Sequence, residues 1–351
     1  MKKIVWMLII ALPFVSGCKK DKEEDQRVNK LPARFGIDIP VSISWAGTTK
    51  DMAYDTLYGN EIYEHMRVFI NVGEESANIV ATIIGAIGTY NIDREMEFDY
   101  TGQDGRSKHA IVEQNKSLEG TSYEFKMDIK DNDGSNAMLI YWNTSPIKGV
   151  AFLRPYNLDR TTIVGHHNAV VRVDYDETGT SYEKTMIVQI TGLDSLEVNW
   201  MDKMKMFVGK TGNQIDVYGN SNHPSAIIVD PNYTGGRNWA FVARADDAED
   251  IGVAIVDLPP CAANTVTLAN NDYSIYHVLE TEINNIGITD STAIANYLAN
   301  AQEPGYFIGT QGFVSCGSVI PNHIGFTSVF LDLSGLAYYI PNDIRNLVIN
   351  Y

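Results

Sequence analysis

The feature that most constrains the fold is a series of short apolar segments separated by turns rich in Asp, Asn and Gly. Five segments of β-forming residues follow one another between residues 91 and 156. Asp104-Gly105 and Asp133-Gly134 each stand between two of them. An Asp-Gly pair in this position is a strong hairpin signal, because glycine accepts the positive φ that tight turns need. Another hairpin is predicted over residues 162–191, across Glu177-Thr178-Gly179. The sequence therefore predicts a mainly β, α+β protein built on an antiparallel meander.

The meander is expected to form a curved sheet or a sandwich that packs on one apolar helix. This helix is predicted over residues 76–90, where Ser76 follows two acidic residues as a helix start often does. Apolar residues then recur at helical spacing, at Ile79, Val80, Ile83, Ile84 and Ile87. Gly85, Gly88 and the β-branched residues weaken a helix, so a pair of buried strands is the alternative.

Other elements are predicted with similar local arguments. Residues 35–45 alternate as a strand does, and Pro40 suggests a sheet edge. Another strand is expected over residues 63–72. A helix over residues 292–302 is preceded by the capping residue Asp290, and Pro259-Pro260 indicates a loop.

The chain is longer than one hydrophobic core usually supports, so two domains are expected. The first is an N-terminal β domain over residues 32–160 that contains the predicted helix 76–90. The second is a C-terminal β-rich domain over residues 161–351 with the short helix 292–302.

Residues 1–17 have the composition of a secretory signal. Lys2 and Lys3 precede an apolar run from Ile4 to Val15, and small residues lead to Cys18. The run is shorter than a membrane span needs, although an ordinary membrane anchor is the alternative interpretation. The pattern resembles the bacterial lipobox, which implies that Cys18 is acylated, for example with palmitate, and becomes the first residue of the mature protein.

Residues 18–31 form a charged tether after that cysteine. The step Lys22-Glu23-Glu24 resembles the acidic export signal of Bacteroidota surface lipoproteins. This resemblance covers only the targeting segment. It implies an outer-membrane lipoprotein, anchored by its N-terminal lipid and exposed on the cell surface.

The formal net charge is −17. A strongly acidic chain without a basic patch repels phosphate backbones, so nucleic acid is not expected as a partner. The acidic excess suits a secreted protein that must stay soluble.

If Cys18 is lipidated, Cys261 and Cys316 remain. Two cysteines in an oxidising compartment predict one disulfide bond, with two buried free thiols as the alternative.

No catalytic or metal signature is evident. The sequence Asp131-Asn132-Asp133-Gly134 begins like a calcium loop, but Trp142 stands where the bidentate Glu belongs, so a hairpin turn is the prediction. His166 and His167 are adjacent in a predicted strand, so their rings are expected to point to opposite faces and not to bind one metal together. His223 precedes a proline in an Asn-rich turn and is expected to face solvent. No metal, cofactor or catalytic residue is predicted.

Three aromatic residues are candidate ligand contacts, because planar rings in loops stack on sugar faces: Tyr156, Tyr233 and Trp239. The functional prediction is a lipid-anchored, non-catalytic binding or accessory protein whose ligand is a glycan or a lipid. The main alternative is a carrier that holds an apolar ligand, a lipid, in a half-barrel cavity formed by the curved sheet. A glycan-active hydrolase is the third hypothesis, because carboxylate pairs cannot be recognised from sequence.

Overall fold

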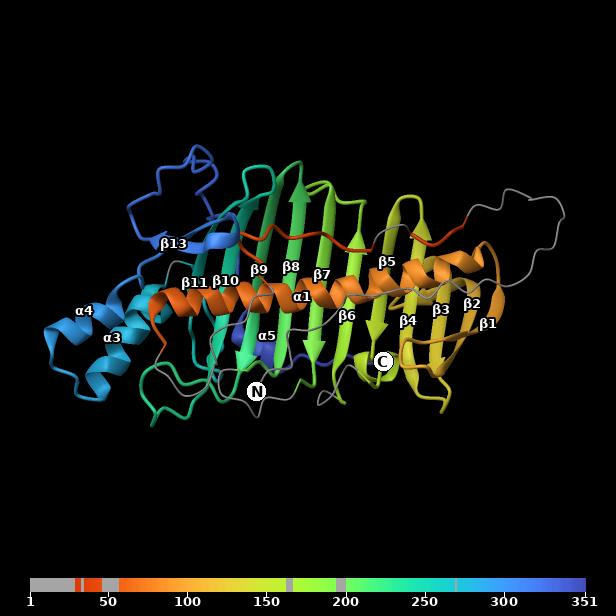
Figure 1. Ribbon diagram of the computed structural model, residues 1–351, viewed down its shortest axis with the longest axis horizontal. Coiled ribbons are helices and arrows are strands. Elements are labelled where there is room, and N and C mark those ends of the chain that lie inside the picture. The colour runs from red at the N-terminus through yellow and green to blue at the C-terminus, as the bar shows by residue number, and fades with distance from the viewer. Residues whose placement is uncertain (1–28, 33–34, 46–56, 162–166, 194–199, 269) are drawn as a thin grey trace.

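The computed structural model describes residues 29–32, 35–45, 57–161, 167–193, 200–268 and 270–351. Its main element is one antiparallel sheet of 13 strands that follow one another in chain order (Figure 1). The strands are β1 Met96–Thr101, β2 Ser107–Leu118, β3 Thr121–Asp131, β4 Asn136–Thr144, β5 Ile147–Leu153, β6 Val170–Asp176, β7 Lys184–Thr191, β8 Lys203–Thr211, β9 Gln214–His223, β10 Arg237–Asp246, β11 Ile251–Asp257, β12 Gly305–Ile308 and β13 Gly312–Cys316.

The helices are few. They are α1 Gly59–Ile87, α2 Pro155–Leu158, α3 Ile275–Asn285, α4 Ser291–Leu298 and α5 Pro341–Arg345, with short 3-10 turns η1 Gly88–Tyr90, η2 Asn271–Tyr273 and η3 Gly309–Gln311. The predicted mainly β, α+β fold class is therefore confirmed. Within the described residues, none of these helices combines the length and apolar character needed to cross a membrane.

The Asp-Gly turns lie where the sequence predicts them. Gly105 and Gly134 have φ of 72° and 84° in the β1–β2 and β3–β4 turns. The Gly134 N–H donates to the Asp131 carbonyl at 2.9 Å and closes the second turn. Strands β5 and β6 pair directly, so the sheet is continuous although residues 154–169 separate the two strands in the sequence.

Helix α1 runs across one face of the sheet, perpendicular to the strands (Figure 1). Its buried residues recur every three or four positions and join the main core with the inward side chains of the strands: Ile62, Met66, Phe69, Ile70, Ala77, Val80 and Ile84. At Gly73 the helix comes so close to the sheet that an added Cβ would lie 2.5 Å from Met206 Cε. The helix thus fills this face.

The predicted strand over residues 63–72 is wrong, because these residues form the first half of α1. The predicted helix over residues 76–90 is its second half, so Ser76 is not a cap. Tyr63, Val68 and Val72 favour strands locally, but burial of one helical face against the sheet outweighs that preference. The helix begins at Gly59, where the Tyr58 N–H donates to Glu61 Oε2 at 2.9 Å.

Residues 35–45 are not a strand either. Phe35, Ile37, Ile39 and Ile43 are buried as predicted, but Val41 on the same predicted face is exposed, and Ser42 and Ser44 are buried, so the alternation of a strand is not kept. The segment packs beside α1 instead of pairing with the sheet. The Ile39 N–H and the Ser44 hydroxyl both donate to the carboxylate of Glu74.

The chain after β13 returns across the opposite face of the sheet. Phe326, Phe330 and Leu333 pack on β10–β12, and Tyr351 reaches Phe152 on β5, where the ring centroids are 5.7 Å apart. Lys203 Nζ donates to the Arg345 carbonyl at 3.0 Å along the way. Helix α1 therefore lies on one face of the sheet, and the C-terminal segment crosses the other face between β12 and β5.

The predicted disulfide bond is wrong. Cys261 and Cys316 are both free. Cys261 lies in the loop after β11, where its thiol contacts the His223 carbonyl, whereas Cys316 pairs with Gly305 at the end of β13. The excursion through α3 and α4 between β11 and β12 separates the two thiols. The predicted helix 292–302 appears as α4, capped by Asp290, which accepts from the N–H groups of Thr292 and Ala293.

Candidate functional sites

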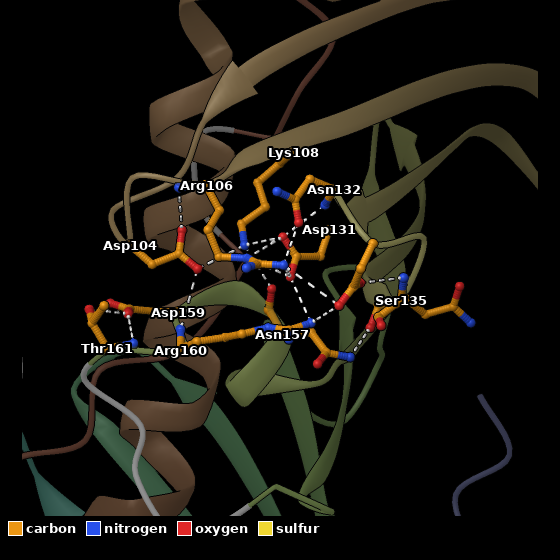
Figure 2. A network of polar contacts seen from close by, with 12 residues as sticks. Asp104, Arg106, Lys108, Asp131, Asn132, Ser135, Asn157, Asp159, Arg160 and Thr161 are labelled. Atoms are coloured by element: carbon orange, nitrogen blue, oxygen red, sulfur yellow. Dashed lines mark hydrogen bonds and ion pairs between the residues drawn. The ribbon is translucent and has the colours of Figure 1, made fainter.

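The most densely connected polar group lies where the β1–β2 and β3–β4 turns meet α2 (Figure 2). We call Asp104, Arg106, Lys108, Asp131 and Arg160 the polar cluster. Lys108 is 1% exposed, and its Nζ donates to Asp104 Oδ2 and Asp131 Oδ1, both at 3.0 Å. Its third proton goes to the Asn157 carbonyl of α2 at 2.9 Å. A buried ammonium with three acceptors has no donor left for a ligand.

Both carboxylate oxygens of Asp131 also have cationic partners. Arg106 Nε lies 3.0 Å from both of its carboxylate oxygens, and Arg160 Nη2 lies 2.8 Å from Oδ2. Burial opposes ionisation, but the hydrogen bonds from Arg106 and Lys108 outweigh it and lower the pKa of Asp131. Calcium would have to displace these cations. The polar cluster therefore joins two hairpins to α2 and is a stabilising element.

A second group, the acid cluster, consists of Tyr63, Asp257, Glu303 and Tyr338. Asp257 ends β11 and is 2% exposed. Burial raises its pKa to about 7. Burial also raises the pKa of Glu303 to about 8, and repulsion from Asp257 adds to the shift. Tyr63 donates its hydroxyl proton to the Gln302 carbonyl at 2.9 Å.

Carboxyls with pKa values near neutrality are typical of proton-transfer sites. Here, however, the buried position of Asp257 leaves no access for a sugar or an ester. The part of the chain described by the structure holds no group of three or more His, Cys, Asp or Glu residues arranged to bind a metal. The acid cluster is thus a largely buried group whose protonation changes near neutral pH.

A third feature is the loop after β13, residues 317–331, which we call the apolar loop. Its aliphatic side chains are strongly exposed: Val319 (75%), Ile320 (48%), Ile324 (86%) and Val329 (76%). In Figure 1 the loop, in blue, projects at the upper left. Residues 304–331 include no Asp, Glu, Lys or Arg, although a fifth of the whole chain is charged. Exposed apolar groups gathered on one loop indicate an interaction surface.

The apolar loop is held in place from beneath. Phe326 and Phe330 turn inward, and the Phe326 ring meets that of Tyr306 edge to face, with centroids 5.4 Å apart. Arg244 Nη1 donates to the carbonyls of Val329 and Asp332 at the base of the loop. The exposed aliphatic groups thus belong to an ordered element.

The predicted aromatic ligand contacts do not form one platform. Tyr156 lies in α2 and stacks on His167, with ring centroids 4.0 Å apart. Tyr233 precedes β10 and lies under the guanidinium of Arg237. Trp239 in β10 is completely buried, and its Nε1 donates to the Ile62 carbonyl, so it offers no surface for stacking. Strands β6–β9 lie between the connection that holds Tyr156 and strand β10, which holds Trp239.

Other sequence candidates have different outcomes. Cys18 and His166 lie outside the described residues. His223 was expected to face solvent, but it ends β9 in the core, where its Nε2 is 2.7 Å from Ser221 Oγ. The sequence reasoning missed both the acid cluster and the apolar loop. The absence of charge over residues 304–331 is the signal that could have revealed the loop. Comparison with family models, curated protein sequences and solved structures gives no match.

Proposed function

We propose that the protein is a lipid-anchored, surface-exposed lipoprotein of the outer membrane that acts as a non-catalytic binding or accessory component. The observation that carries the proposal is the apolar loop, an ordered and uncharged surface element on an otherwise strongly acidic chain. The lipobox-like sequence that ends at Cys18 and the charged residues after it support attachment through an N-terminal lipid.

The packing of α1 favours this function over an apolar-ligand carrier. A carrier needs open volume between the helix and the sheet, whereas the contact of Gly73 with Met206 and the buried face of α1 occupy that space. Native mass spectrometry of the purified protein separates the two. A ligand-free mass is expected, and a stoichiometric bound lipid would instead favour the carrier.

The third hypothesis, a glycan-active hydrolase, is disfavoured because the carboxyl of Asp257 is buried and a substrate could not reach it. A panel of glycan and ester substrates tests this directly, with the Asp257→Asn variant as the control for any turnover. Activity that this variant abolishes would overturn the non-catalytic assignment.

Lipid attachment is tested by expression of the full chain in a Bacteroidota host with labelled palmitate. The label is expected on the wild type and on Cys261→Ala, and it should be absent from Cys18→Ala. Label retained by Cys18→Ala would contradict the lipobox. Surface exposure is tested with protease on intact cells. Cleavage is expected for the wild type, and substitution of Lys22, Glu23 and Glu24 by alanine should protect the protein.

A further inference from the structure

We propose that the apolar loop inserts its aliphatic side chains into the surface of a lipid bilayer of low negative charge, as a second attachment beside the N-terminal lipid. The inference rests on the proposed function and deepens it. It assigns the loop a specific occupant, a zwitterionic membrane surface, and it orients the protein on that surface.

The shape and chemistry of the apolar loop favour a bilayer over a protein partner. Val319, Ile324 and Val329 are each at least three-quarters exposed, so they stand out as separate knobs. A protein partner would need a matching pocket for each knob, and protein interfaces are anchored mainly by Trp, Tyr and Arg. A fluid bilayer adapts to protruding groups and gains from the burial of any aliphatic side chain.

The charges on and beside the apolar loop indicate which lipid headgroups the loop would contact. The apolar loop itself has no charged residue, and Arg244 at its base is paired with Asp216 at 2.6 Å. Gly325 packs against Ile251 and Glu249, which places the loop beside the acidic β10–β11 turn. That turn includes Asp247, Glu249 and Asp250. Anionic lipids would be repelled by these carboxylates, so a zwitterionic surface is preferred.

The topology puts the apolar loop and the start of the described chain at the same edge of the sheet. In a meander every second turn lies at the same edge, so the end of β4 and the β10–β11 turn share one. Trp142, two residues before the end of β4, donates to the Lys30 carbonyl at 2.8 Å. In Figure 1 the described N-terminal segment, in red, and the apolar loop both lie toward the upper edge.

The tether is short enough to hold this edge near a membrane. Eleven residues lead from Cys18 to Asn29, and even a fully extended chain of that length spans at most about 40 Å. A lipid at Cys18 would keep the apolar loop at high effective concentration over the bilayer, so weak insertion suffices. One lipid chain alone binds reversibly, and a second contact makes attachment stable.

The test uses the full, natively processed chain reconstituted in phosphatidylcholine vesicles. A fluorophore is placed on Ile324→Cys in the apolar loop or, as a control, on Thr234→Cys in the β9–β10 loop at the opposite end of β10. Both variants have Cys261→Ser and Cys316→Ser, and thermal melting checks that they fold. Lipids with a nitroxide on the upper acyl chain should quench the label at position 324 at least about threefold more than at position 234.

Matched substitutions extend the test. Val329→Asp should reduce quenching at position 324 to the level of position 234. Val348→Asp, on an equally exposed valine of the C-terminal segment, should leave it unchanged. Added phosphatidylglycerol should weaken quenching at position 324, and salt should restore it. Hydrogen exchange of residues 317–331 in the unsubstituted chain should slow in vesicles relative to detergent, which provides a measurement that needs no cysteine variants.

Three results would overturn the inference. The first is equal quenching at both positions together with unchanged hydrogen exchange. The second is protection of position 324 that disappears when the protein is diluted in the bilayer, which would mean contact with a second copy. The third is protection that requires another added protein. The mass of the N-terminal peptide keeps the two proposals apart. A missing lipid on Cys18 refutes the anchor, whereas a lipidated chain with an exposed label refutes only the bilayer contact.

Discussion

Lys108 Nζ lies 3.0 Å from Asp131 Oδ1, and both side chains are almost completely buried between two hairpin turns and α2. This ion pair links turns that are about 25 residues apart in the chain, because Arg106 and Lys108 come from β2 and its turn and Asp131 ends β3. A buried ion pair of this kind is strongly destabilising to break, since the remaining charge loses its partner.

Asp131→Ala should therefore lower the free energy of unfolding by about 3–5 kcal/mol, because it leaves Lys108, Arg106 and Arg160 without a shared carboxylate. Urea denaturation followed by circular dichroism measures the loss. Asp133→Ala is the matched control, since Asp133 belongs to the same turn but is 40% exposed. Equal losses in the two variants would contradict the structural role given to the buried pair.

Asp257 and Glu303 should make the protein less stable as pH rises. Their folded pKa values of about 7 and about 8 lie above the values near 4 expected after unfolding. The folded state therefore holds more protons, and the associated stability is complete below about pH 4 and lost as pH rises through 7–8. Each carboxyl contributes up to about 4 kcal/mol.

Asp257→Asn and Glu303→Gln should flatten the dependence of unfolding free energy on pH between about 4 and 8 and stabilise the protein at pH 8. Denaturation at a series of pH values measures the slope. Asp272→Asn, at an exposed position, should leave it unchanged. A wild-type slope in both cluster variants would argue against buried protonated carboxyls.

His65 should have the opposite effect on the pH dependence of stability: it should make the protein less stable as pH falls. Burial lowers its pKa to about 4, so it is neutral in the folded state. Its stabilising contribution is present above about pH 6.5 and is lost as pH falls through 4. His65→Phe should reduce acid destabilisation in that window, whereas His277→Gln on an exposed face should not. Thermal melting at pH 4.5 and pH 7 compares them, and an unchanged difference in the His65 variant would refute this role.

Two glycines should respond oppositely to alanine. Gly85 lies on the exposed side of α1, and an added Cβ meets no atom within 4 Å, so Gly85→Ala should stabilise by about 0.5–1 kcal/mol. At Gly149 in β5 an added Cβ would lie 2.4 Å from the Tyr141 carbonyl oxygen and close to the Phe35 ring. Gly149→Ala should destabilise the protein clearly. Melting temperatures decide, and a shift in the same direction for both would contradict the packing described here.

The hairpins could be predicted because their signals are local. Asp104-Gly105 and Asp133-Gly134 fix the turns through the backbone freedom of glycine, whatever lies elsewhere in the chain. The first half of α1 could not be predicted the same way. Tyr63, Val68 and Val72 favour extended structure, and only the sheet beneath them makes helical burial more stable.

The candidate sites also differ in whether local sequence or tertiary packing produces them. The absence of charge over residues 304–331 is a property of the sequence, and so is the pattern around Cys18. The exposure of Val319 and Ile324, by contrast, follows from the inward packing of Phe326 and Phe330, which no local rule indicates. The acid cluster brings together residues from α1, β11, the loop before β12 and the C-terminal segment, so its raised pKa values arise only in the folded protein.

The sequence by itself determined a meander of antiparallel strands, because turn chemistry and alternation act between neighbours in the chain. Tertiary structure alone decided that residues 63–72 are helical, that residues 35–45 lie beside α1, and that Cys261 and Cys316 stay apart. It also decided which apolar residues remain on the surface. These outcomes depend on how much surface each segment buries against partners distant in sequence, and that free energy exists only once the sheet has formed.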